Sequence, residues 1–227
     1  MSSTSRNLCL FDLDDTLLPL DSDHAWGAFV VRLGWVDAHD FGRRSDEFFA
    51  QYQVGQLDIH AYIEFATAPL RARSRAEIDA AHRQFMQEVI APNLHPQALA
   101  LVREHQQRGD LVALVTATND FVTGPIAQAL GIDDLIAVQL AHGPGGTITG
   151  QIQGTPSYRE GKVTRVQEWL AQRSSQWSDY EHISVYSDSV NDLPLLERAT
   201  DAVATNPTPA LQAIAEQRGW RILKLFD

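Results

Sequence analysis

The stretch FDLDDTLL, residues 11–18, decides the fold that we expect, together with the short apolar run NLCLF, residues 7–11, that leads into it. The apolar run predicts a buried strand. Asp12, Asp14 and Asp15 crowd the carboxyl end of this strand, which faces the ligand crevice in open α/β sheets. Alternation along the extended chain places Asp12 and Asp14 on the same side. Because neighbouring carboxylates repel each other, the pair indicates a divalent cation, which would also attract phosphate; the alternative is an acidic turn that only ends a strand.

From residue 92 onward, predicted helices and strands alternate. Short connections between alternating elements favour a mostly parallel sheet with helices on both of its faces. Glycines at positions 145, 146 and 150 also indicate a hairpin over residues 147–153. The predicted strands are residues 111–115, 135–140, 183–186, 202–204 and 222–225, and the predicted helices are residues 97–107, 121–130, 162–172, 193–199 and 209–217.

Residues 21–91 have a different pattern, with no convincing strand. Four helices are predicted to begin at the capping residues Asp21, Asp37, Asp58 and Ser74. We expect this segment to be inserted after the first strand as an all-helical cap over the acidic end of the sheet. The predicted division is a core of residues 1–20 and 92–227 and a cap of residues 21–91.

Composition restricts the class of protein. The chain has 227 residues, of which 44% are hydrophobic and 21% charged, and its net charge is −11, as expected for a globular protein with a sizeable core. The sequence has no run of Lys and Arg of the kind that would indicate a nucleic-acid partner. No apolar run is long enough to span a membrane, and residues 1–7 lack the apolar region of a signal peptide, so we expect a cytoplasmic protein. The single cysteine, Cys9, cannot form an intrachain disulfide and is expected to be buried.

Two further residues lie where chemistry is expected. Thr116 directly follows the predicted strand 111–115, where its hydroxyl and the amides of the next helix would suit a phosphate oxygen, although threonine is also common at strand ends. Lys162, one of only two lysines, opens a predicted helix, where a cation opposes the helix dipole. Residues that break a local preference are often functional, but a solvated surface lysine is the alternative.

The segment YSDSVNDLP, residues 186–194, again places acids beyond a strand. Asp188 is a candidate metal ligand. Asp192 is expected either to hold Lys162 or to bind a metal water from the second shell. Alternatively, one of these two acids only caps the following helix.

Taken together, these features resemble the haloacid dehalogenase-like superfamily of phosphatases, and most closely its phosphoserine phosphatase-like branch. The resemblance rests on FDLDDTLL, Thr116, Lys162 and SDSVNDLPLL (residues 187–196), and it covers the whole chain because the helical insertion matches the helical cap of the family. It implies a Rossmann-like α/β core. One departure is the run Ala117-Thr118-Asn119, where phosphoserine phosphatases usually have glycines.

The resemblance implies roles for the acids and the metal. Asp12 would attack phosphorus and form an aspartyl-phosphate, and Asp14 would protonate the leaving alcohol and then activate water. Mg²⁺ would bind the Asp12 carboxylate, the Asp14 main-chain carbonyl and Asp188, and Asp192 is included among the candidate metal residues.

The same resemblance implies how a substrate is held. Thr116 and Lys162 would bind the phosphate oxygens, and Ala117 and Asn191 are included among the candidate substrate-binding residues. The predicted function is a Mg²⁺-dependent phosphomonoester hydrolase for a small phosphorylated metabolite. A phosphomutase with the same covalent chemistry and a noncatalytic sensor of phosphorylated ligands are the alternatives.

Substrate choice is expected to lie in the cap. Asp21 and Asp23 would bind a substrate ammonium, or they only cap a helix. Four arginines would bind a carboxylate, or they form a solvated face: Arg43, Arg44, Arg71 and Arg73. Phosphoserine needs an acidic and a basic subsite, whereas an amino-alcohol phosphate such as histidinol phosphate needs mainly the acidic one.

Overall fold

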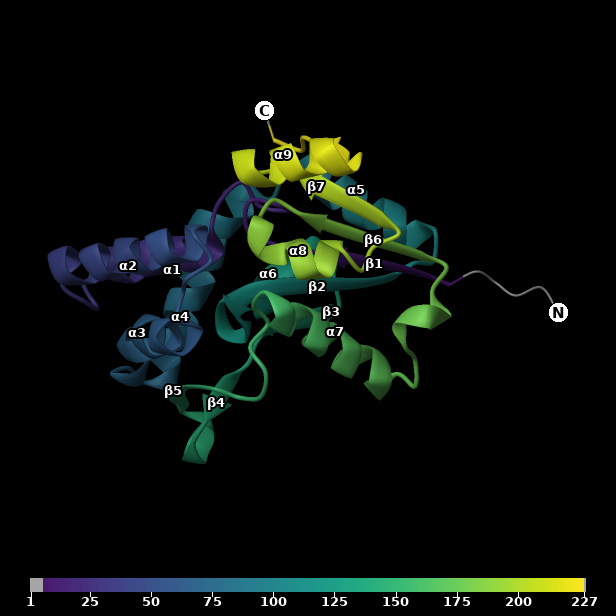
Figure 1. The fold of residues 1–227 in the computed structure, drawn as a ribbon. Coiled ribbons are helices and arrows are strands. Elements are labelled where there is room, and N and C mark those ends of the chain that lie inside the picture. Colours follow the sequence, from purple (N-terminus) through teal and green to yellow (C-terminus); the bar gives the residue numbers. More distant parts are fainter. Residues whose placement is uncertain (1–5, 227) are drawn as a thin grey trace.

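The computed structural model describes residues 6–226, which form one six-stranded parallel sheet and a separate two-stranded hairpin (Figure 1). The sheet order is β3-β2-β1-β6-β7-β8, so β1 lies at the centre. The strands are β1 (Asn7–Phe11), β2 (Leu111–Asn119), β3 (Asp134–Val138), β6 (His182–Ser187), β7 (Asp201–Thr205) and β8 (Arg221–Leu223). The predicted α/β class with a parallel sheet is confirmed.

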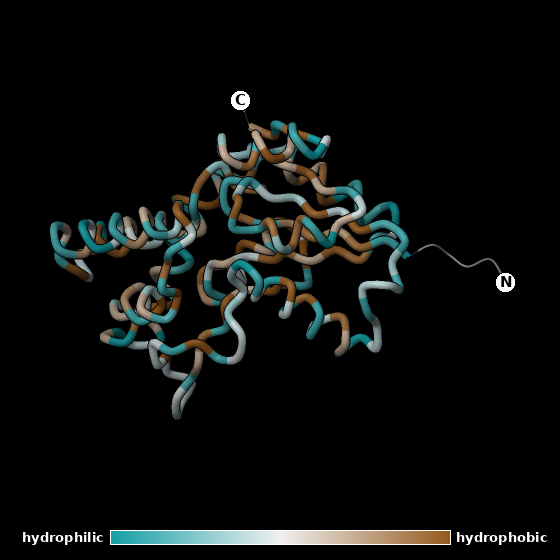
Figure 2. The backbone as a smooth tube through the Cα atoms, viewed as in Figure 1, coloured by the Kyte–Doolittle hydropathy of each residue, from teal (hydrophilic) through white to brown (hydrophobic). Residues whose placement is uncertain are grey.

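Helices cover both faces of the sheet, so both faces are buried. Alternate residues of each strand point to opposite faces. Cys9 and Phe11 of β1 pack with residues of α5 (Pro96–Gln107) and α6 (Asp120–Leu130). Leu8 and Leu10 pack on the other face, with residues of three helices. These are α7 (Glu160–Gln172), α8 (Leu193–Leu196) and α9 (Pro209–Arg218). Figure 2 shows the apolar strands in the middle of this arrangement.

Residues 21–91 contain helices and connecting turns but no strand, as predicted, and this segment lies to one side of the sheet (Figure 1). The helices are α1 (Ser22–Arg32), α2 (Ala38–Gln53), α3 (Ile59–Arg71) and α4 (Arg75–Phe85), followed by a π-helical turn, Met86–Ile90, and a 3₁₀ turn, Ala91–Asn93. Each helix begins after the predicted capping residue, whose side chain accepts main-chain N–H groups. Helix α3 includes Pro69 and continues to Arg71.

Strand β2 is longer than predicted, because it continues from Val115 to Asn119 before α6 begins. Its pairing with β3 shifts register between Val115 and Asn119, so the chain stays extended beyond the regular ladder. The side chain of Asn119 caps α6 by accepting from Val122 N at 3.1 Å. Residues 116–118 therefore belong to the strand and not to a turn into the helix.

The predicted strand 135–140 is divided in two. After β3 the chain leaves the sheet and forms β4 (Leu140–His142), which pairs antiparallel with β5 (Ile148–Ile152) across the predicted glycine turn. The division occurs where Leu140 N donates to the Asp120 carboxylate instead of to a neighbouring strand. Helix α8 is also shorter than predicted and ends at Leu196.

The β4–β5 hairpin packs against α3 of the helical segment (Figure 1). An apolar cluster joins them, formed by Ile59 and Ile63 of α3 with Val138 and Leu140. Arg71 Nη1 also donates to the Thr149 carbonyl at 3.2 Å. The hairpin thus braces the helical segment against the sheet. The boundaries of core and cap at residues 20–21 and 91–92 stay a prediction.

Within residues 6–226, no helix is both long enough and apolar enough to cross a bilayer. Cys9 is buried, as expected. The absence of an apolar signal-peptide region concerns mainly residues 1–5, which lie outside the described residues.

Gly161, in the first turn of α7, lies so close to the preceding loop that a side chain would not fit. An added Cβ would lie 2.0 Å from the carbonyl oxygen of Pro156. We expect Gly161→Ala to lower the free energy of unfolding by about 1–3 kcal/mol, because main chain must move to relieve the overlap. Thermal and urea denaturation measure this loss.

The matched control for this change is Gly124→Ala in α6, where an added Cβ meets nothing within 4 Å. It should be neutral or stabilising by up to about 1 kcal/mol, because alanine favours a helix more than glycine does. Equal stability of Gly161→Ala and the wild type would contradict the close approach.

Candidate active site

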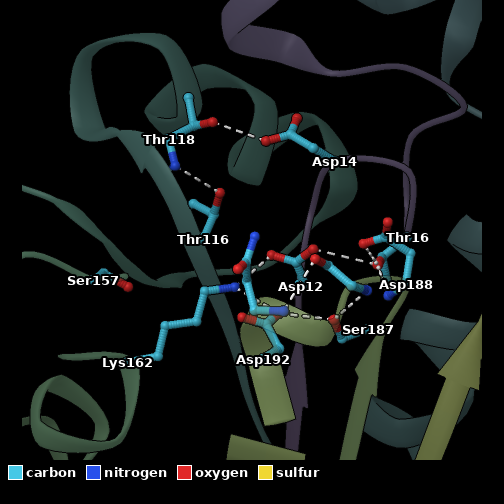
Figure 3. Close-up of polar contacts among 12 residues, drawn as sticks. Asp12, Asp14, Thr16, Thr116, Thr118, Ser157, Lys162, Ser187, Asp188 and Asp192 are labelled. Atoms are coloured by element: carbon cyan, nitrogen blue, oxygen red, sulfur yellow. Dashed lines mark hydrogen bonds and ion pairs between the residues drawn. The ribbon is translucent and has the colours of Figure 1, made fainter. Parts of the chain in front are cut away.

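Three neighbouring strands, β1, β2 and β6, bring the predicted site residues together at their carboxyl ends (Figure 3). Asp12 directly follows β1, Thr116 lies near the end of β2, and Asp188 directly follows β6. All three side chains are buried, with exposed fractions of 7%, 0% and 8%. Sites of open α/β sheets are expected at this edge.

Lys162 reaches the same point from α7, and its ammonium group lies between two carboxylates (Figure 3). Its Nζ is 2.8 Å from Asp12 Oδ1 and 2.7 Å from Asp192 Oδ2. Only 1% of the residue is exposed, so the interpretation as a solvated surface lysine is wrong. Burial lowers the pKa of Lys162, but the two carboxylates together outweigh it and raise the pKa above its ordinary value. The lysine is therefore charged throughout the neutral pH range.

Asp192 takes the first of its two predicted roles, the contact with Lys162. The same carboxylate oxygen, Oδ2, also accepts from Ser187 Oγ at 2.8 Å. Asp192 is therefore held by two donors inside the site.

Asp12 and Asp188 are linked by the hydroxyl of Thr16. Thr16 Oγ1 lies 3.3 Å from Asp12 Oδ2 and 3.4 Å from Asp188 Oδ1, and it accepts from Asp188 N at 3.1 Å. Burial raises the pKa of Asp12 to about 7, against the effect of Lys162. Burial, followed by the negative charge of Asp12, raises the pKa of Asp188 well above its usual range. Among the described residues no Lys or Arg forms an ion pair with Asp188, and the charge of Lys162 lowers the pKa of Asp188 by less than burial and the acids raise it.

The donor atoms at this point suit a hard cation. Oxygen ligands with few protein carboxylates are typical of Mg²⁺ sites. Within residues 6–226, no group of three or more His, Cys, Asp or Glu side chains is arranged to hold a metal. Asp192 Oδ2 is engaged by both Lys162 and Ser187. The metal ligands expected at Asp12, Asp14, Asp188 and Asp192 stay a prediction.

Asp14 lies beside this cluster, with one donor on each carboxylate oxygen. Ser22 N donates to Oδ1 at 2.7 Å, and Thr118 Oγ1 donates to Oδ2 at 2.8 Å. Burial, followed by the charge of Asp21, raises the pKa of Asp14 to about 7. A carboxyl group with such a pKa can both donate and accept a proton near neutral pH.

Thr116 lies at the same edge of the sheet as Asp12 and lines the same cavity, but the predicted helix amides do not surround it. The helix begins four residues later, at Asp120. Instead Thr118 N donates to Thr116 Oγ1 at 3.1 Å within the extended end of β2.

An acidic and aromatic cavity lies between this edge of the sheet and the helical segment. Its empty volume is about 560 Å³. Thr116, Ala117 and Thr118 line it on the side of the sheet, and no Lys or Arg of the described residues is in the lining. The carboxylates in the lining belong to Asp12, Asp14, Asp21 and Asp23, and the aromatic rings to His24, Phe48, Phe49, Tyr52 and Tyr62.

Asp21 and Asp23 differ in their contacts. Asp21 is the N-cap of α1 and accepts from the main-chain N–H groups of Asp23 and His24. Asp23 is not a cap. It is 7% exposed, accepts from Asn119 Nδ2 at 3.4 Å and is hydrogen-bonded to Tyr62. Burial raises its pKa to about 7, so this carboxylate is poorly stabilised without a cationic partner.

The other candidate substrate residues lie outside the cavity. Asn191 Nδ2 donates to the carbonyl of Tyr52 at 2.9 Å and so joins α2 to the loop after β6. The four arginines have other neighbours. Arg43 pairs with Glu47, Arg44 stacks on Phe48 and Phe65, Arg71 binds Thr149, and Arg73 stacks on Trp35.

Sequence reasoning did not assign Thr16, Thr118, Ser187 or Tyr62 to the site. Thr16 and Ser187 lie within the recognised motifs, so their positions in the sequence could have indicated that they belong to the site. Thr118 has the spacing of a residue that shares the face of Thr116, provided that the strand continues. No local signal indicated Tyr62, because it reaches Asp23 from another helix.

Comparisons with known proteins agree with this geometry. A family model described as "haloacid dehalogenase-like hydrolase" matches residues 9–197. A histidinol-phosphatase of Neisseria meningitidis serogroup C (strain 8013) is 42% identical over 218 residues, covering 96% of this chain and 98% of the relative. The crystal structure of a protein with unknown function from Bordetella pertussis Tohama I has a TM-score of 0.92 and 49% identity, covering 98% of this chain and 100% of that one.

A substrate-bound phosphoserine phosphatase has a TM-score of 0.67 at 18% identity, covering 97% of this chain and 94% of that one. This likeness shows a shared fold. The family model includes Asp12, Thr116, Lys162 and Asp188, which the fold brings to one point. The chain belongs to the haloacid dehalogenase-like hydrolase family.

Proposed function

We propose that this protein is a Mg²⁺-dependent phosphomonoesterase that works through an aspartyl-phosphate on Asp12. The observation that carries this proposal is the surroundings of Asp12. Its carboxylate is held by Lys162 on one side and lies next to Thr16 and Asp188 on the other. It also lines the floor of the cavity together with Asp14. A nucleophile, a general acid and cationic stabilisation are thus within reach of one phosphoryl group.

In the first step, an Asp12 oxygen attacks phosphorus while the bond from phosphorus to the substrate oxygen breaks. Asp14 gives its proton to that oxygen, and the alcohol leaves. Water then attacks the aspartyl-phosphate, Asp14 takes a proton from it, and phosphate and free Asp12 are released. Lys162 and Thr116 bind the outer phosphate oxygens and offset the charge of the transition state. Mg²⁺, bound by Asp12, Asp188 and the Asp14 carbonyl, would supply the remaining positive charge.

For the substrate we propose a small phosphomonoester with a cationic group and no carboxylate, such as histidinol phosphate. The acidic lining of the cavity supports this choice, because Asp21 and Asp23 offer carboxylates to a cation. The carboxylate of phosphoserine would find no Lys or Arg in the described lining. The aromatic residues suit a flat ring, and the name of the Neisseria relative agrees. The cytoplasm remains the predicted compartment.

The nucleophile is tested by Asp12→Asn. The variant should keep the fold, because the side chain has the same shape and one of several crowded carboxylates is removed. Release of phosphate should fall by at least about 1,000-fold, because an amide cannot form the aspartyl-phosphate. A phosphate-release assay measures this, with circular dichroism as the check on folding. Near-wild-type turnover in a pure sample would rule out the mechanism.

The metal is tested by chelation. Activity should disappear in excess chelator and return with Mg²⁺, whereas Ca²⁺ should compete but support little turnover because its larger, looser shell misplaces the nucleophile. Asp188→Asn should raise the Mg²⁺ concentration that gives half-maximal activity. Asp201→Asn, an exposed acid paired with Arg221, is the control and should not. Full activity in chelator would contradict the roles given to Asp12 and Asp188.

The acidic subsite is tested by Asp23→Asn with two substrates. Loss of a charge-assisted hydrogen bond should raise KM for histidinol phosphate by about 10- to 100-fold. KM for p-nitrophenyl phosphate, which has no cation, should change little. The control is Asp37→Asn, which makes the same change at an exposed N-cap of α2. Equal losses on both substrates would mean that Asp23 is only structural.

A further inference from the structure

Thr118 makes two contacts that join separate parts of the site (Figure 3). Its hydroxyl donates to Asp14 Oδ2 at 2.8 Å, and its main-chain N–H donates to Thr116 Oγ1 at 3.1 Å. The residue is 5% exposed and lines the cavity. One residue therefore contacts both the proposed acid and a proposed phosphate ligand.

The position of Thr118 follows from the extended end of β2. Residues two apart in a strand point to the same face, so Thr116 and Thr118 both face the site because the strand continues past Val115. A turn at this point would remove that alignment. A glycine at position 118 would keep the main-chain contact to Thr116 but lack the hydroxyl that reaches Asp14.

This hydroxyl and Ser22 together hold the Asp14 carboxyl group. The final torsion of an aspartate side chain is soft, so its carboxyl plane is set by the donors around it. Oδ1 has the Ser22 N–H at 2.7 Å, whereas the donor to Oδ2 is Thr118. A carboxylate oxygen has more than one acceptor position, so the proton for the leaving alcohol can still reside on Asp14 while Thr118 donates.

We propose that Thr118 is a positioning residue that holds the Asp14 carboxyl group in line for both proton transfers. The proposal rests on the proposed function, in which Asp14 protonates the leaving alcohol and then takes a proton from water. Thr118 itself exchanges no proton with the substrate.

This role predicts a dependence on the leaving group. An alkoxide is a poor leaving group and must receive the Asp14 proton as its bond to phosphorus breaks. A p-nitrophenolate is a stable anion and departs without a proton. Misalignment of Asp14 should therefore slow formation of the aspartyl-phosphate from alkyl esters, but not from p-nitrophenyl phosphate. Hydrolysis of the aspartyl-phosphate should be slowed for both substrates, because the water still needs a base.

The experiment compares Thr118→Val with the wild type on p-nitrophenyl phosphate and on the alkyl phosphomonoester that the wild type hydrolyses best. We expect kcat/KM to fall by about 10- to 100-fold for the alkyl ester, the size typical of a misplaced catalytic group, and by less than about threefold for p-nitrophenyl phosphate. Rapid mixing with p-nitrophenyl phosphate should show a burst of p-nitrophenolate equal to the enzyme concentration, followed by slow turnover.

Two further variants separate this role from a structural one. Thr118→Ser keeps the hydroxyl and should restore most of the activity on the alkyl ester, and Thr118→Ala should behave like Thr118→Val. Thr67→Val is the matched control, because Thr67 is a buried threonine of α3 whose hydroxyl bonds to the Ile63 carbonyl of its own helix. It should leave both activities unchanged.

Equal loss on the two substrates, no loss on either, or no rescue by serine would overturn the role of Thr118 while leaving the proposed function intact. Failure of the wild type to release phosphate from any ester would instead overturn the proposed function itself.

Discussion

The site depends on the ammonium group of Lys162, held between Asp12 and Asp192 inside the protein. Buried carboxylates repel each other and lose hydration, so they need a partner with good geometry. The lysine provides it at 2.8 Å and 2.7 Å, and it does so from a helix on one face of the sheet. Gly161, the residue before Lys162 in the first turn of that helix, lies so close to the main chain of Pro156 that a side chain would not fit. Around Asp188, where no such partner exists among the described residues, the oxygen donors suit a divalent cation.

The extended end of β2 organises the other half of the site. Thr116 lines the cavity together with Asp12. Thr118 donates to the carboxyl group of Asp14, and Asn119 donates to the carboxylate of Asp23. These contacts lie within four consecutive positions of one strand, so a change of backbone here would affect the phosphate site, the acid and the cap together. The same segment begins α6 through the cap formed by Asn119. In this chain, the continued strand holds these three side chains in fixed positions, which a flexible turn could not do.

The proposed selectivity rests on charge rather than on shape alone. The helical segment contributes acids and aromatic rings to the cavity, while its arginines face other surfaces. Asp21 caps a helix, whereas Asp23 is buried against Tyr62 and Asn119, and burial raises the pKa of both carboxyl groups to about 7. A cationic substrate would remove the cost of that buried charge, which gives the cavity a physical preference for such ligands.

The sequence by itself determined the parallel α/β class, the capped helices and the acids at the strand ends, because hydrophobic periodicity, capping residues and strand alternation are local properties. It also placed Asp12, Thr116, Lys162 and Asp188 in one site, since parallel strands end at one edge of a sheet. The continuation of β2 accompanies a register shift in its pairing with β3. The departure of β4 from the sheet accompanies the bond from Leu140 N to Asp120. No local pattern in the sequence shows either feature. Only the tertiary structure separated the roles of Asp21 and Asp23, brought Thr118 to Asp14 and left the arginines outside the cavity, because each of these depends on which distant element packs beside the residue.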